Sequence, residues 1–110
     1  LLNEAALEKI CGLIMATKIP QRPLTHLEKI ICDADLDYLG RDDFRRISNA
    51  LRLEFLAHDI VKNDREWEEK QIHFFEQHKY FTTTSNNLRN AMKLQQLAKL
   101  KQIFSLNYGI

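Results

Sequence analysis

The sequence predicts an all-α fold, a helical bundle of about five helices in a single domain that spans residues 1–110. Five segments carry apolar residues at spacings of three and four, which is the period of an amphipathic helix. No segment alternates with the two-residue period of a strand, and the breaks between segments are short and polar. A chain of 110 residues with 45% hydrophobic residues can bury a core without a disulfide or a structural metal.

A proline-containing break separates the first two expected helices. The first helix should cover about residues 3–18 and end before Ile19-Pro20-Gln21-Arg22-Pro23, because each proline disfavours helix at the residue before it. Thr25 and Glu28 have the spacing of a capping box, which predicts that the second helix begins at Thr25. Gly40 is a usual residue just past a helix end, so this helix should stop near it. The apolar row of the first helix is Leu7, Ile10, Leu13 and Ile14.

Cap residues also mark the three remaining helices. The third should cover about residues 42–57, and Asn63 with Glu66 three positions later can cap the fourth. Thr82-Thr83-Thr84-Ser85 is polar and rich in capping residues, and a fifth helix follows to about Leu106. The stripe of the fourth helix reads Trp67, Gln71, Phe74, His78 and Phe81.

The fifth expected helix is apolar on two sides. One row contains Leu88, Met92 and Gln95, and the other contains Leu94, Leu97 and Phe104. Such a helix is either sandwiched between neighbours or exposed to a partner. After Glu76 the chain carries a charge of +5 and no acid, so this region is either a solvated basic face or one that attracts anions.

Composition argues against several partners and compartments. The net charge of +1 gives no reason to expect a nucleic acid, and no run approaches the roughly 20 apolar residues of a membrane span. Cys11 and Cys32 lie in apolar helical patterns without a Cys or His at metal-ligand spacing, as small buried residues do in a reducing compartment. We therefore expect a cytoplasmic protein.

Three aspartates alternate near the end of the second expected helix, in the segment Asp33 to Gly40. At 100° per residue, Asp35 and Asp37 lie about 80° from the apolar centre and Asp33 lies about 120° away. We therefore expect the Asp35 carboxylate at the border of the core. A partly buried carboxylate must be neutralised, paired or bound to a metal, so both a metal ligand and a salt-bridged or solvated helix-end acid remain open. The apolar centre is set by Leu27, Ile30, Ile31, Ala34 and Tyr38.

Four segments occur in an order that resembles a known family. They are Ile14-Met15-Ala16-Thr17-Lys18, Asp33 to Gly40, Leu51-Arg52-Leu53-Glu54-Phe55, and Gln71 to Thr82. Together they resemble the HD-domain metal-dependent phosphohydrolases, in a branch that reads Ile-x-Ala-Thr, then Asp-Ala-Asp-Leu-x-x-Leu-Gly, then Arg-x-Glu with an aromatic residue. The resemblance covers most of the chain.

This resemblance implies a helical bundle that binds one or two divalent cations through a His, a His-Asp pair and a later Asp. The later Asp corresponds to Asp35, which Asp33 could assist, and the metal would be Mn, Mg, Ni or Fe. It would polarise a phosphate ester and activate a water. The family places its His and His-Asp pair ahead of Leu1, so we expect this chain to be the C-terminal portion of the domain. The later pair His58-Asp59 comes in the wrong order, and we interpret it as a helix end followed by a loop.

Other polar residues have both a structural and a functional interpretation. Thr17 either bonds back to the preceding turn or serves the site. Glu54 and Arg52 belong to the Arg-x-Glu segment and are candidate catalytic residues, although Glu54 could instead pair with Arg52 or Arg41. Gln71 and His78 interrupt an aromatic stripe, which favours hydrogen bonding inside the core over metal ligation.

Two functions follow as expectations. In the first, the chain belongs to a phosphohydrolase that acts on a nucleotide or another small phosphate ester, and without the upstream ligands it should be inactive alone. In the second, it is a non-catalytic helical interaction or oligomerisation module. Homo-oligomers, or association with an N-terminal part, are the partners we expect.

Overall fold

The computed structural model describes Ala5 and residues 21–109, and within this part the chain forms helices and no strand. The all-α prediction is therefore confirmed for the described residues. The predicted first helix, apart from Ala5, lies outside them, together with Cys11 and Thr17. The elements are α2 (His26–Asp35), the 3-10 helix η1 (Asp37–Gly40), α3 (Phe44–Ala57), α4 (Asp64–Gln77) and α5 (Thr83–Tyr108).

Three of the α-helices begin at side-chain caps. Two of these caps, Thr25 and Asn63, were predicted, and the third lies in the segment Thr82 to Ser85 that was predicted to be rich in capping residues. Thr25 caps α2, Asn63 caps α4 and Thr82 caps α5, each by accepting a bond from a backbone N–H three residues later. These bonds come from Glu28, Glu66 and Ser85, at 3.1, 2.9 and 3.1 Å. The starts of these helices are thus fixed by local sequence.

The capping glutamates reach one residue further back than a capping box requires. Glu28 accepts from the N–H of Leu24 at 3.0 Å, and Glu66 accepts from the N–H of Lys62 at 2.7 Å. Each carboxylate therefore gives a hydrogen-bond acceptor to the backbone N–H of the residue before the cap, which fixes the direction in which the chain enters the helix.

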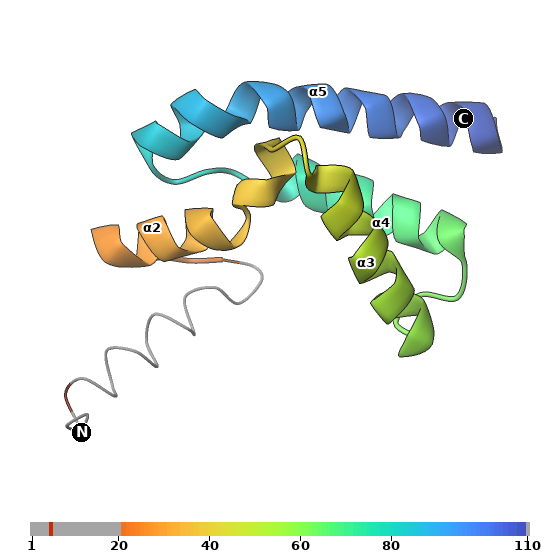
Figure 1. The fold of residues 1–110 in the computed structure, drawn as a ribbon, viewed down its shortest axis with the longest axis horizontal. Coiled ribbons are helices and arrows are strands. Elements are labelled where there is room, and N and C mark those ends of the chain that lie inside the picture. The colour runs from red at the N-terminus through yellow and green to blue at the C-terminus, as the bar shows by residue number, and fades with distance from the viewer. Residues whose placement is uncertain (1–4, 6–20, 110) are drawn as a thin grey trace.

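The second predicted helix is shorter than expected, because α2 ends at Asp35 and the chain continues as the tighter 3-10 helix η1, which ends at Gly40. Gly40 lies where η1 packs closely against Arg89 of α5, with no room for a side chain. A Cβ on it would lie 2.3 Å from the backbone oxygen of Arg89 and 2.7 Å from the Arg89 Cβ. The missing side chain lets η1 lie directly against α5, as the yellow turn beneath the blue helix shows in Figure 1.

The long helix α5 runs over η1 and α4, and α3 lies on the other side of η1 (Figure 1). Leu36, Leu39, Phe44 and Phe75 form the core at this crossing. The rings of Phe44 and Phe75 meet edge to face at 5.2 Å. The core thus fixes η1, and with it the end of α2 that carries the aspartates.

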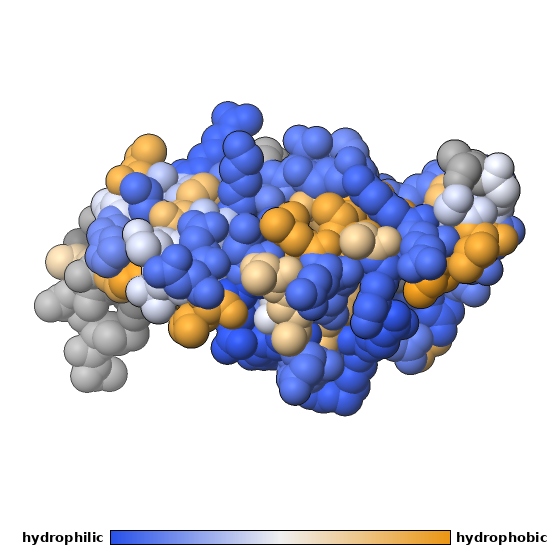
Figure 2. Space-filling view, turned by 90° about the horizontal axis from the view of Figure 1, so that it is seen from above, coloured by the Kyte–Doolittle hydropathy of each residue, from blue (hydrophilic) through white to orange (hydrophobic). Residues whose placement is uncertain are grey.

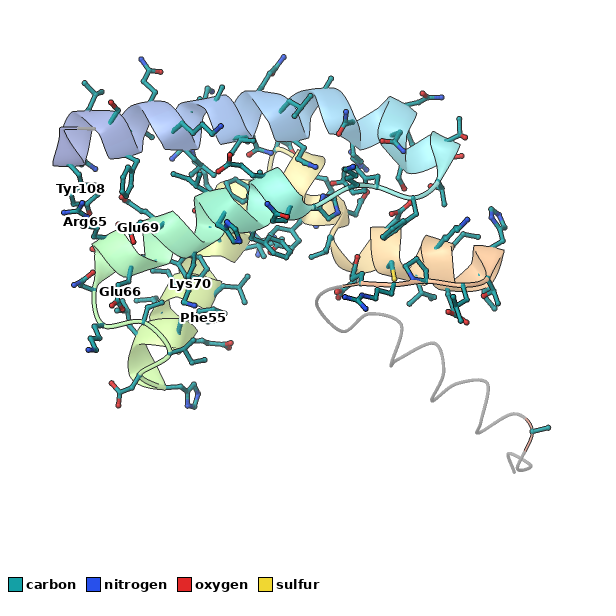
Figure 3. All side chains as sticks on the ribbon, turned by 180° about the vertical axis from the view of Figure 1, so that it is seen from behind. Phe55, Arg65, Glu66, Glu69, Lys70 and Tyr108 are labelled. Atoms are coloured by element: carbon teal, nitrogen blue, oxygen red, sulfur yellow. The ribbon has the colours of Figure 1, made fainter. Side chains whose placement is uncertain are left out.

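At its far end α5 is held to α4 by Arg65, which lies beside Tyr108 in Figure 3. The Arg65 guanidinium is 5.0 Å from the centre of the Tyr108 ring and pairs with Glu69 at 3.2 Å.

The two apolar rows of α5 have different surroundings. Leu97 and Leu100 pack against the core, whereas Leu88, Met92 and Leu106 are exposed. Figure 2 looks down onto this side of the molecule and shows orange hydrophobic patches separated by blue hydrophilic surface.

Candidate functional site

Asp33 is the most buried acid of the described residues, with 2% of its surface exposed. Its Oδ1 accepts from the N–H of Phe81 at 2.8 Å. Its Oδ2 accepts from the N–H of Thr82 at 2.8 Å and from the Thr82 hydroxyl at 2.7 Å. The carboxylate therefore serves the start of α5, where backbone donors lack partners within the helix. With both oxygens engaged, Asp33 does not fit a metal-ligand role.

Asp35 has the opposite environment. It is the last residue of α2, its side chain is exposed, and it makes no hydrogen bond or ion pair with another described residue. Partial desolvation raises the pKa of the Asp35 carboxyl above its usual value. The last turn of α2 contains no basic residue, so this carboxylate stands at the negative end of the helix dipole without a cation.

The predicted burial of these two acids was therefore wrong. The helical wheel placed Asp35 at the border of the core and Asp33 furthest from it, whereas Asp33 is buried and Asp35 is exposed. The wheel describes α2 alone. The segment that enters α5 covers the polar side of α2 because Asp33 offers it an acceptor.

Asp37 holds the turn after Asp35 in place. It pairs with Arg89 of α5 at 2.9 Å and with Arg41 at 3.4 Å. Arg41 in turn pairs with Asp43 at 2.9 Å. The pKa of Arg41 is raised, first by its hydrogen bond to Asp43 and then by the charges of both aspartates. These ion pairs link η1 to α5 and to the start of α3.

The described residues do not form a complete metal site. Within residues 21–109 no three His, Cys, Asp or Glu side chains lie close enough together to hold a metal ion. Asp35 alone among the three alternating acids is free to act as a ligand. Any metal held there needs further donors.

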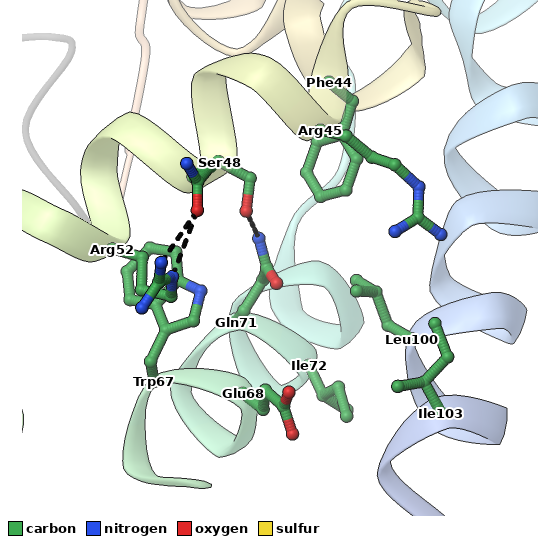
Figure 4. A pocket seen from close by; sticks show the side chains of 11 residues that line it. Phe44, Arg45, Ser48, Arg52, Trp67, Glu68, Gln71, Ile72, Leu100 and Ile103 are labelled. Carbon is green, nitrogen blue, oxygen red and sulfur yellow. Dashed lines mark hydrogen bonds between the residues drawn. The ribbon is translucent and has the colours of Figure 1, made fainter. Parts of the chain in front are cut away.

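Arg52 of the Arg-x-Glu segment lines a cavity between α3, α4 and α5, where it forms hydrogen bonds (Figure 4). Arg52 donates to Asn49 Oδ1 from Nε at 3.2 Å and from a terminal nitrogen at 2.9 Å, and it pairs with Asp64 at 2.9 Å. Glu54 is exposed. The expected pairing of Glu54 with Arg52 or Arg41 was wrong, because both arginines pair with aspartates instead. These contacts assign Arg52 to the junction of α3 and α4.

The two polar residues in the stripe of α4 form hydrogen bonds in the interior, as predicted. The Gln71 amide donates to the Ser48 hydroxyl (Figure 4). The Nδ1 atom of His78 lies 3.0 Å from the Lys93 ammonium, which also donates to the His78 carbonyl oxygen at 2.7 Å. Burial, followed by the nearby positive charge of Lys93, lowers the pKa of His78 to about 4.

Two further predictions are confirmed. His58 is the C-cap of α3 and Asp59 has a positive φ of 55°, so the pair is a helix end followed by a loop. Cys32 is fully buried, and burial raises the pKa of its thiol.

Sequence reasoning missed three residues that build this region: Thr82 as a partner of Asp33, Arg89 as a partner of Asp37, and Lys93 as a buried cation. Each contact joins residues far apart in the chain. The sequence offered one signal for these contacts. The second helix is acidic and the fifth is basic, and opposite charges favour contact between the two segments.

No family model, curated protein or solved structure matches this chain. No helix in the described part is long and apolar enough to cross a bilayer.

Proposed function

We propose that this chain is the C-terminal part of an HD-type metal-dependent phosphohydrolase domain, in which Asp35 is a carboxylate ligand of a divalent cation. The observation that carries the proposal is that two of the three alternating aspartates have structural partners among the described residues and the third does not. Asp33 accepts three hydrogen bonds from Phe81 and Thr82 just before α5, and Asp37 pairs with two arginines, which leaves Asp35 exposed. The substrate class is a nucleotide or another small phosphate ester.

The electrostatics of Asp35 support a cationic partner. A carboxylate at the C-terminal end of a helix is unfavourable, because the unpaired carbonyl groups there already carry partial negative charge. The last turn of α2 supplies no basic side chain to offset it. A divalent cation at this position would be stabilised by both the carboxylate and the helix end.

The surrounding contacts also hold Asp35 in a defined place. Asp33, two residues earlier, is fixed to α5 by three hydrogen bonds, and Asp37, two residues later, is fixed by Arg41 and Arg89. A metal ligand needs such positioning by its neighbours. The metal itself, Mn, Mg, Ni or Fe, would polarise a phosphate oxygen and activate a water.

Asp35→Asn tests the proposal, with Asp42→Asn as the matched control. Both residues are exposed aspartates, and neither has a hydrogen bond or ion pair to another described residue. The protein is this chain joined to the upstream segment that supplies the His ligands. Mn²⁺ binding is measured by calorimetry, and release of phosphate is measured with p-nitrophenyl phosphate and nucleoside monophosphates.

We expect Asp35→Asn to weaken Mn²⁺ binding at least about tenfold and to abolish metal-dependent hydrolysis, whereas Asp42→Asn changes neither. The 110-residue chain alone should bind Mn²⁺ weakly, because its described residues bring no three possible metal ligands close together. Micromolar binding to the chain alone that survives Asp35→Asn would refute the assignment of Asp35.

A second candidate is an oligomerisation module, which the exposed apolar residues of α5 favour. Leu88 and Leu106 are 68% and 79% exposed and lie on one face of the helix, since eighteen residues are five turns. Sedimentation equilibrium tests it by comparing the chain with Leu88→Glu and Leu106→Glu, and with the α3 control Leu53→Glu. A dimer that only the α5 variants dissociate would support this candidate, and a monomer at all concentrations would exclude it.

A further inference from the structure

A cavity of about 130 Å³ lies beside His78, and its lining residues come from distant parts of the chain. Apolar walls are supplied by Leu36, Phe74 and Phe81, and polar groups by Gln21, Gln77, His78 and Lys79. Asp35 does not line it, so an inference about this cavity is independent of the metal proposal.

Two buried nitrogen atoms at this cavity lack hydrogen-bond partners. Nε2 of His78 and Nε2 of Gln21 are both inaccessible to solvent, and neither has an acceptor. His78 is only 9% exposed. A buried donor without a partner costs about 1–3 kcal/mol, so two of them at one cavity indicate that an acceptor belongs there.

The contacts of Lys93 determine which His78 nitrogen carries the proton. An ammonium group has three donors and no acceptor, so it can only donate to Nδ1, which lies 3.0 Å away. In the neutral ring the proton must then be on Nε2. His78 therefore presents an N–H donor, and a ligand at this atom must supply an acceptor.

Two cations, Lys93 and Lys79, lie beside His78, and the one carboxylate of the described residues whose charge reaches its ring, Asp33, has both oxygens engaged by Phe81 and Thr82, so the remaining charge favours a negative ligand. Lys93 is 3% exposed, its ammonium lies 5.5 Å from the centre of the Tyr80 ring, and no carboxylate of the described residues is in ion-pair contact with it. A buried cation without a counter-ion is unfavourable, and an anion bound to the far side of the His78 ring would offset part of this charge. Lys79 adds a second positive charge at the cavity.

We propose that this cavity binds a small oxyanion, whose oxygen atoms accept hydrogen bonds from His78 Nε2–H and from the Gln21 amide. The shared chemistry is that of a carboxylate group or an inorganic phosphate, and the volume admits only a small molecule. The Lys93 ammonium polarises the ring through Nδ1 and thereby strengthens the Nε2–H donor.

Nitrogen NMR of the histidine ring tests the proposal in two steps. The first is the tautomer, which the ¹⁵N shifts of His78 report directly, and we expect the proton on Nε2. The second is a titration with sodium acetate and, separately, with sodium phosphate, at ionic strength held constant with sodium chloride. We expect a saturable shift of the His78 Nε2–H resonance with at least one of the two anions, and the anion that saturates identifies its class.

Three variants make the titration specific. His78→Asn keeps an acceptor for Lys93 but removes the donor at the cavity, and we expect it to abolish the saturable binding. Gln21→Ala, in the segment before α2, should weaken binding by about tenfold through the loss of one hydrogen bond to a charged group. Gln102→Ala is the control, because Gln102 is exposed on α5 away from the cavity.

Three results would overturn the proposal. The first is a proton on Nδ1 of His78. The second is a linear, non-saturating response to both anions, which would mean that only water occupies the cavity. The third is an affinity that Gln21→Ala and Gln102→Ala change equally.

Discussion

The Asp33 carboxylate accepts hydrogen bonds from three donors of Phe81 and Thr82, just before α5 begins. Without Asp33 these donors would need water as their partner. Asp35 is two residues away on the same helix and is in contact with solvent. An aspartate in a helix therefore gains its role from whatever packs over it. The same holds for His78, whose ring is buried by its contact with Lys93 of α5.

The contrast between the two acids predicts different effects on stability. Asp33→Asn should destabilise the fold by about 2–3 kcal/mol, because hydrogen bonds to a charged acceptor are lost and a buried donor is introduced beside Thr82. Asp35→Asn should change the free energy of unfolding by less than about 0.5 kcal/mol. Urea unfolding measures both. Equal losses would contradict the assignment of separate roles.

The lowered pKa of His78 predicts that the folded protein loses stability in mild acid. The pKa of His78 is about 4 in the folded state and about 6.5 in the unfolded chain, so the unfolded chain binds more protons between these values. Stability from this group is fully present above pH 6.5 and is lost as the pH falls towards 4. His78→Asn should flatten this part of the pH profile relative to the unchanged protein, as measured by urea midpoints at several pH values. An unchanged slope in the variant would refute the prediction.

At the scale of elements, the close approach of η1 to α5 depends on Gly40. Gly40→Ala would place a Cβ 2.3 Å from a backbone oxygen of α5, and a backbone cannot yield as a flexible side chain can. We expect a loss of at least about 2 kcal/mol in thermal or urea unfolding. Gly109→Ala is the control. Its φ is 70° and nothing lies within 4 Å of the added atom, so the cost is limited to about 1 kcal/mol of backbone strain.

The elements that could be predicted from the sequence are those fixed locally. Thr25, Asn63 and Thr82 mark helix starts because a cap and its partner are three residues apart. Gly40 was read as a helix terminator, but its reason is contact with Arg89, 49 residues later in the chain. Periodicity along one helix carries no information about such a partner.

The candidate site could be predicted only in part, for the same reason. The helical setting of the alternating aspartates was predicted correctly as far as Asp35. Which of the acids is buried depends on the segment Phe81 to Thr82, and a wheel drawn on α2 alone does not contain it. The pairing of Arg52 with Asp64 likewise joins two helices.

At the scale of the whole molecule, the small net charge conceals a spatial arrangement. The 3-10 helix η1, which follows the acidic helix α2, lies against the basic helix α5, and the ion pair of Asp37 with Arg89 joins η1 to α5. This ion pair, the hydrogen bonds of Asp33 to Phe81 and Thr82, and the close packing of Gly40 on Arg89 all connect the Asp33 to Gly40 segment to the first half of α5 or to the residues just before it. Asp35 therefore lies between two residues, Asp33 and Asp37, that are both fixed by contacts with α5 or the residues just before it.

The assignment of Asp35 as a metal ligand is tested most directly by a calorimetric Mn²⁺ titration of the chain joined to the proposed upstream ligand segment, in which Asp35→Asn is compared with the control Asp42→Asn. We predict that Asp35→Asn weakens metal binding at least about tenfold and that Asp42→Asn leaves the affinity unchanged. Full Mn²⁺ binding retained in Asp35→Asn would contradict the assignment.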